Sequence, residues 1–273
     1  MQRFKVLVPV DFTKETDVAI QSAVNLSKEI PLEVIFIHVV TKKSMIEEKL
    51  MRLEWRISQQ ATKLMGPYKT VVRVGKLFEQ LAKAGKDNEV DVMLLGIHES
   101  STMNKMFGSN ALKVVGNCKF PIITIKGGDT FRPIKKIVIT MDVVMKSVQI
   151  VRHVEKIAQL FGAKVFLIGG QHTDDTLRKK SRIYFAIAEK RLIHANIECE
   201  AIALGRKKFK ENLLNLCREE DIDLLAATFY TDNETVLSIP FVQQLMDNKL
   251  GIPTMVIDGF PSSSTSQLAG IIS

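Results

Sequence analysis

The sequence has few cysteines and no long apolar run. Its three cysteines, Cys118, Cys199 and Cys217, form no CxxC pair, and such a scattered set is typical of reduced thiols in a cytoplasm. No apolar run approaches the ~20 residues that are needed to span a bilayer. Asp11 interrupts the first apolar stretch, Val6–Val10, too early for a secretory signal. We therefore expect a cytoplasmic protein without a membrane partner.

Signatures of catalysis and metal binding are also absent. The five histidines show no metal-ligand spacing such as HxxxH, and there is neither a nucleophile-elbow serine nor a Walker A loop. No metal site and no catalytic residue are therefore predicted, and the chain is not expected to be a dedicated enzyme.

The net charge of +8 fits anionic partners in general. It is not accompanied by interleaved aromatic and basic residues, so a nucleic-acid partner is not predicted. Two basic clusters, at 178–182 and 206–210, are expected to be solvated surface. The alternative is that they contact an anionic partner.

The chain repeats itself. Five segments recur in the same order at an offset of 130–132 residues, which indicates duplication of a whole domain. The matching pairs are Lys5–Asp11 with Lys136–Asp142, Leu32–Val40 with Ala163–Gln171, Gly75 with Gly205, Glu89–Leu95 with Asp221–Ala227, and Phe120–Ile125 with Ile252–Ile257. We expect one domain over residues 1–128, a second over 129–259 and a tail over 260–273.

Each copy alternates short apolar strands with amphipathic helices. In the first copy, the expected strands are Val6–Val10, Val34–Val40, Val71–Val74, Val90–Leu95 and Ile122–Ile125, and the expected helices are Asp17–Ile30, Ser44–Met65, Lys76–Asn88 and Asn110–Cys118. This order predicts an α/β fold of two tandem, doubly wound domains, each with a five-stranded parallel sheet.

In open α/β sheets, ligands bind beyond the carboxyl ends of the strands. Pro9 and Asp11 end the first strand, Val39 lies at the end of the second, and Gly96 ends the fourth. Asp11 is a candidate to accept hydrogen bonds from a ribose or an adenine amino group. The alternative, compatible with it, is that Asp11 caps the helix that follows, where Thr13 and Thr16 are the other candidates.

The start of a later helix supplies a candidate phosphate site. A glycine lets the backbone approach a ligand closely, and the free N–H groups of a helix start bind anions. The residues at this position are Gly108, Ser109 and Asn110. Elsewhere, we expect His38 to be a structural histidine, Cys118 to be a small core residue, and Trp55 to pack rather than to bind a partner.

The sequence resembles the universal stress protein family over nearly its whole length, twice. The resemblance rests on Pro9-Val10-Asp11-Phe12, on His38-Val39, on a loop of the form G-x-x-G-x9-G-[ST], and on the strand Pro121–Ile125. It implies a Rossmann-like, adenine nucleotide α-hydrolase-like fold. The loop, which holds ATP phosphates in the nucleotide-binding branch, departs from the pattern. Glu99 replaces the second glycine of the pattern. Only eight residues separate Glu99 from Gly108, whereas the pattern has nine.

The resemblance implies a stress-response module that binds ATP or AMP in its first domain. No nucleotide is expected in the second domain, which has no glycine between Ala227 and Gly251. The alternatives are a nucleotide-independent scaffold for a protein partner and a weak ATPase. By analogy with the family, the two domains are expected to pair through their last strands. A homodimer of the chain is also considered.

Overall fold

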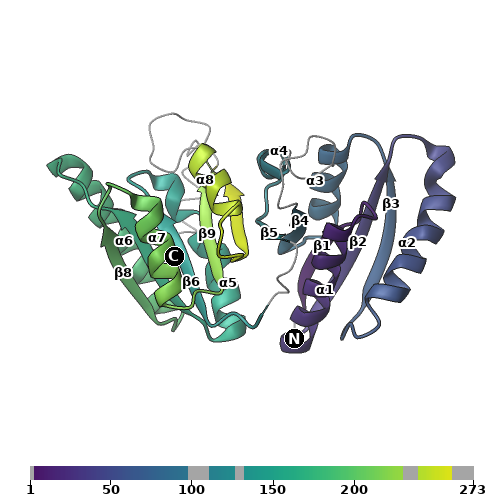
Figure 1. Ribbon diagram of the computed structural model, residues 1–273, viewed down its shortest axis with the longest axis horizontal. Helices are drawn as coiled ribbons and strands as arrows, with labels where there is room; N and C mark the ends of the chain where they lie inside the picture. The colour runs from purple at the N-terminus through teal and green to yellow at the C-terminus, as the bar shows by residue number, and fades with distance from the viewer. Residues whose placement is uncertain (1–2, 98–110, 127–131, 230–238, 260–273) are drawn as a thin grey trace. The chain divides into compact units, whose positions relative to one another are not determined.

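The computed structural model describes residues 3–97, 111–126, 132–229 and 239–259. The chain divides into two compact units, with the boundary between Pro133 and Ile134 (Figure 1). Each unit has its own parallel sheet, so each is described by itself.

The sheet of the first unit has the strand order β3-β2-β1-β4-β5, and all four neighbouring pairs are parallel. Its strands are rich in valine and isoleucine and are buried on both faces near the centre of the sheet, as expected for a covered parallel sheet. They are β1 (Phe4–Pro9), β2 (Leu32–Val40), β3 (Tyr68–Val74), β4 (Val92–Ile97) and β5 (Ile122–Lys126).

The sheet of the second unit has the equivalent order β8-β7-β6-β9-β10, again with parallel neighbours. Its strands are β6 (Lys136–Met141), β7 (Lys164–Gly170), β8 (Cys199–Leu204), β9 (Leu224–Phe229) and β10 (Thr254–Asp258). The predicted fold class, two tandem doubly wound domains with five-stranded parallel sheets, is therefore confirmed.

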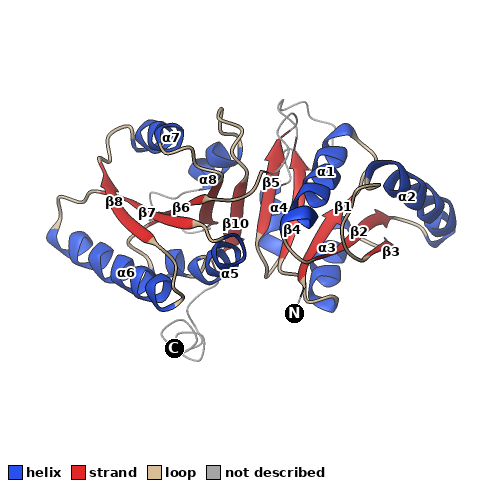
Figure 2. Cartoon of the chain, turned by 90° about the horizontal axis from the view of Figure 1, so that it is seen from below, coloured by secondary structure: helices blue, strands red, loops and turns tan. Residues whose placement is uncertain are grey.

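Helices cover both faces of each sheet (Figure 2). In the first unit α1 (Lys14–Glu29) and α2 (Ile46–Gln60), preceded by the 3-10 turn η1 (Lys43–Met45), lie opposite α3 (Leu77–Asp87) and α4 (Ala111–Asn117). In the second unit η2 (Met145–Val148), α5 (Val151–Phe161) and α6 (Asp175–His194) precede α7 (Phe209–Glu219) and α8 (Ile239–Met246), which lie on the other face.

The repeat extends to individual hydrogen bonds. The Asp91 carboxylate accepts a hydrogen bond from the Lys5 N–H at 2.8 Å, and the Asp223 carboxylate accepts one from the Lys136 N–H at 3.0 Å. Two residues before each aspartate, Glu89 and Asp221 have φ angles of 51° and 52°. Two unusual left-handed residues at matching positions indicate that both copies close this turn in the same way.

The expectation that Trp55 packs into the core is wrong. Leu53 and Ile57 are the buried residues of α2, whereas Trp55 is 61% exposed. Because successive helix residues are 100° apart, Trp55 points away from the face that carries Leu53 and Ile57. Periodicity identified the buried face of α2, but a tryptophan outside that face remains in solvent.

The thiols differ in accessibility. Cys118 and Cys217 are each 1% exposed, and burial raises the pKa of both to about 12. Cys199, at the edge strand β8, is less buried, and its pKa is raised by burial and by Glu189 and Glu198. We expect a thiol reagent at pH 8 to label Cys199 first. Mass spectrometry of the labelled native protein measures the order, and equal labelling of all three cysteines would contradict it.

Candidate functional site

The candidate site lies at the carboxyl ends of β1, β2 and β4. Strand order reverses between β1 and β4, because the chain runs outward from β1 to β3 and then returns to β4. Ligands of open α/β folds bind at such a switch point. Pro9 pairs with Ile37 of β2, and the next N–H, that of Val10, donates to the Ile37 carbonyl at 2.7 Å. Asp11 therefore follows directly after the carboxyl end of β1.

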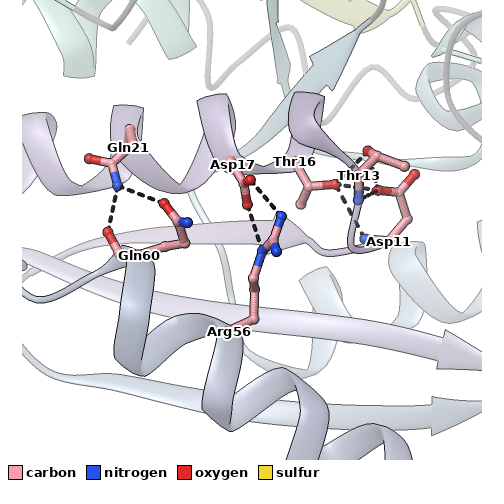
Figure 3. Close-up of polar contacts among 7 residues, drawn as sticks. All are labelled: Asp11, Thr13, Thr16, Asp17, Gln21, Arg56 and Gln60. Carbon is pink, nitrogen blue, oxygen red and sulfur yellow. Dashed lines mark hydrogen bonds and ion pairs between the residues drawn. The ribbon is translucent and has the colours of Figure 1, made fainter.

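Asp11 anchors the first turn of α1 (Figure 3). Its Oδ1 accepts hydrogen bonds from the Thr13 N–H at 3.0 Å, the Thr13 hydroxyl at 2.5 Å and the Thr16 hydroxyl. These contacts explain why α1 begins at Lys14, three residues earlier than the apolar pattern predicted. Thr13 is the N-cap residue, but its side chain makes no capping hydrogen bond, because its hydroxyl is directed to Asp11.

The two carboxylate oxygens of Asp11 differ in their hydrogen bonding. Within the described part of the chain, every hydrogen bond to the Asp11 side chain goes to Oδ1. The helix-anchoring role and the ligand role that the sequence left open therefore remain compatible. Anchoring fixes the orientation of the carboxylate, which is what a hydrogen-bond acceptor for a ribose or an amino group needs.

A stack of side chains lies beside Asp11. Phe12 adopts a φ of 65°, and its ring centroid lies 4.6 Å from that of His38, with the Arg52 guanidinium 4.3 Å from the Phe12 centroid. The Nδ1 atom of His38 lies 2.6 Å from the Val10 carbonyl oxygen, which agrees with the expected structural role for His38. Phe12 was noted only as part of the family motif and Arg52 was not singled out, since their contact depends on how α2 packs beside α1 and β2.

Charged side chains of both signs act on His38. Burial lowers the pKa of His38 below its ordinary value, and the nearby charges of Lys49 and Arg52 lower it further, whereas the hydrogen bond to the Val10 carbonyl and the charge of Asp11 raise it. A neutral imidazole at pH 7 follows. Two cations of α2, Lys49 and Arg52, thus lie near His38, and Lys49 also pairs with Glu48 at 2.7 Å.

Gly96 has a packing role. A Cβ atom built on Gly96 would lie 2.0 Å from the Glu15 carbonyl oxygen and 2.6 Å from its carbonyl carbon, both in the first turn of α1. No side chain fits there, so glycine is required for α1 to lie against β4. The close approach of α1 is therefore sufficient to explain the glycine, and the predicted ligand role is not needed for that explanation.

The remaining candidate residues are distributed as follows. Pro9 is buried at the end of β1, and Val39 lies near the end of β2, paired with Arg73 of β3. The carboxyl ends of β1, β2 and β4 thus bring together Pro9, Asp11, Val39 and Gly96. The predicted phosphate-binding residues Gly108, Ser109 and Asn110 lie outside the described residues, as does Glu99.

The matching corner of the second domain is built differently. Thr228, fully buried, takes the position of Gly96 in the repeat, and the chain after β6 forms the 3-10 turn η2 before α5 begins at Val151. The requirement for glycine at this position of the first domain is therefore not repeated in the second. Asp142, the counterpart of Asp11, is 5% exposed and accepts a hydrogen bond from the Val143 N–H at 2.7 Å.

The described residues show neither a metal cluster nor a membrane-spanning helix. Among them, no group of three or more histidine, cysteine, aspartate or glutamate residues is placed to hold a metal ion. None of the helices in the described ranges is long and apolar enough to cross a membrane.

Comparison with known families identifies the first domain. Residues 3–126 match the model of the universal stress protein family. These residues form a universal stress protein domain. The match covers all five strands of the first sheet and includes Asp11, so the resemblance seen in the sequence is confirmed for this domain.

Solved structures extend the fold to both domains. A universal stress protein from Archaeoglobus fulgidus DSM 4304 is 13% identical, with a TM-score of 0.71, over 95% of this chain and 100% of its own. A protein of unknown function from Pseudomonas aeruginosa PAO1 is 12% identical, with a TM-score of 0.61, over 98% of this chain and 95% of its own. At such identities the likeness establishes the tandem fold. No curated protein matches the sequence.

Proposed function

We propose that the chain is a cytoplasmic stress-response module whose first domain binds an adenine nucleotide, ATP or AMP. The observation that carries the proposal is Asp11, held at the switch point of a universal stress protein domain by three hydrogen bonds to one carboxylate oxygen. Its other oxygen is available to a ribose hydroxyl or an adenine amino group. Arg52 adds positive charge beside it, as does Lys49, which also pairs with Glu48 at 2.7 Å, and positive charge favours phosphate.

The test is calorimetric titration of the full chain with ATP and with AMP. We expect micromolar binding, weakened at least tenfold, or about 1.4 kcal/mol, in Asp11→Asn. Asparagine keeps the size of the side chain but loses the carboxylate charge. The matched control is Asp142→Asn in the second domain, which should leave nucleotide affinity unchanged.

Two results would overturn the proposed site. Undiminished affinity in Asp11→Asn would remove Asp11 from it, and equal losses in Asp11→Asn and Asp142→Asn would point to a general effect on folding. Thermal unfolding of each variant separates lost binding from lost stability, because Asp11 also anchors α1.

A nucleotide-independent scaffold is the second candidate. It is favoured by Gly96, whose presence is explained by the approach of α1, and by Thr228 in the equivalent position of the second domain. A wild-type protein that carries no nucleotide after gentle purification and ignores ATP would support this candidate. The function would then lie on the surfaces of the two domains, whose pairing through their last strands remains part of the proposal.

A further inference from the structure

The strand β8 is an edge strand whose outer side is partly free to form backbone hydrogen bonds. Within the part of the chain that the structure describes, it pairs with β7 alone, and Figure 2 shows it as the outermost strand of the second sheet, between α6 and α7. Natural edge strands usually carry a proline, a bulge or an outward lysine that blocks pairing with another chain. The sequence of β8, CEAIAL, has none of these, and Ala201 and Ala203 are exposed.

The register shows which backbone groups of β8 are free to pair. The Val165 N–H donates to the Glu198 carbonyl at 2.9 Å and the Gln171 N–H to the Leu204 carbonyl at 2.8 Å. In a parallel ladder, alternate residues point their backbone groups to opposite sides. The N–H groups of Cys199, Ala201 and Ala203 therefore point away from β7. The Ala203 carbonyl also faces outward but already accepts a hydrogen bond from the Gln171 side-chain amide at 3.1 Å.

Charge is distributed unequally along this edge. Its amino end carries Glu198 and Glu200, both paired with Lys164 at 3.0 Å, and their side chains stay 72% and 49% exposed. Its carboxyl end continues into Arg206, Lys207 and Lys208, which are exposed. Among the described residues, none of these three cations forms an ion pair.

We infer that β8 is the contact strand of a homodimer, in which β8 pairs antiparallel with β8 of a second copy. A two-fold axis brings the acidic end of each strand to the basic end of the other, so the same attraction occurs twice. If Ala201 lies opposite the partner's Ala203, Glu198 lies opposite the partner's Arg206. Opposite charges across an antiparallel pair stabilise it.

The strand β3, an edge strand of the first sheet, provides the contrast. It carries Lys69 and Arg73, which contact Asn88 and Asp87 of their own domain. In antiparallel pairing of β3 with itself, Thr70 opposite the partner's Val72 would place Lys69 opposite the partner's Arg73. Like charges at that position oppose pairing. Self-pairing in this arrangement is therefore less favourable for β3 than for β8.

The test is sedimentation velocity of the full chain over a range of concentrations. We expect a reversible dimer whose affinity falls at least tenfold in Ala201→Pro. Proline at this position removes only an N–H that points away from β7, so the internal ladder is kept. The matched control is Thr70→Pro, which removes an outward N–H from β3 and should leave the dimer intact.

A charge-reversal pair keeps the test valid if a proline variant fails to fold. Arg206→Glu is expected to weaken the dimer several-fold, and the double change Glu198→Lys with Arg206→Glu is expected to restore most of the affinity. A wild-type chain that is monomeric at all concentrations would overturn the inference. So would a dimer that survives Ala201→Pro, one that dissociates in Thr70→Pro, or a double variant no better than Arg206→Glu. None of these outcomes depends on nucleotide binding.

Discussion

Replacing Gly96 with alanine is expected to lower the free energy of unfolding of the first domain by about 3 kcal/mol, the upper part of the range for overpacked sites. The added Cβ would lie 2.0 Å from the Glu15 carbonyl oxygen. The obstacle is backbone rather than a flexible side chain, so relief requires α1 to move away from β4. Such a movement would also disturb the contacts between Asp11 and Thr16.

Gly116 is the matched control for this substitution. It lies in α4, and a Cβ built there meets nothing within 4 Å. Because alanine is favoured over glycine in helices by roughly 0.5–1 kcal/mol, Gly116→Ala should be neutral or stabilising. Urea unfolding followed by circular dichroism compares the two variants. Equal stability of Gly96→Ala and the wild type would show that α1 and β4 do not need to approach so closely.

Replacing Asn248 with alanine is expected to destabilise the second domain by a similar amount, about 3 kcal/mol. Asn248 is 3% exposed and lies between α8 and β10. Its amide group donates to the Leu245 and Ile252 carbonyls at 2.9 and 2.8 Å. Its oxygen accepts from the Leu250 and Ile252 N–H groups, each at 3.1 Å.

The loss in Asn248→Ala follows from the cost of leaving buried polar groups without partners. Alanine removes the side chain that satisfies backbone groups on both sides of the loop, in a place where water has little access. Asn212→Ala in α7 is the control, since the Asn212 amide makes longer contacts of 3.5 and 3.3 Å with carbonyls near the surface. Thermal unfolding measures both variants, and similar melting temperatures for the two would contradict the prediction.

Much of the fold was predictable because the strands are short runs of β-branched apolar residues separated by helices. Their order and the internal repeat indicated two doubly wound domains. Helix ends were harder to predict, since they depend on side chains that contact the backbone from a distance in sequence. The beginning of α1 was set by Asp11, Thr13 and Thr16 rather than by its apolar stripe.

The candidate site was predictable in location but not in detail. Strand ends identified Asp11 and Gly96, but the sequence alone does not contain the distance between α1 and β4, which explains the glycine. The stack of Arg52, Phe12 and His38 brings together residues from α2, the end of β1 and β2. Their spacing in the sequence carries no signal of that contact.

The exposure of Trp55 has a practical consequence for studying the two domains. It is the only tryptophan of the chain, and it lies in the first domain, with 61% of its surface open to solvent. Indole fluorescence therefore reports on one half of a duplicated protein and is silent on the other. Circular dichroism reports on both domains. Comparing it with the Trp55 fluorescence during unfolding therefore measures how far the stability of each domain depends on the other.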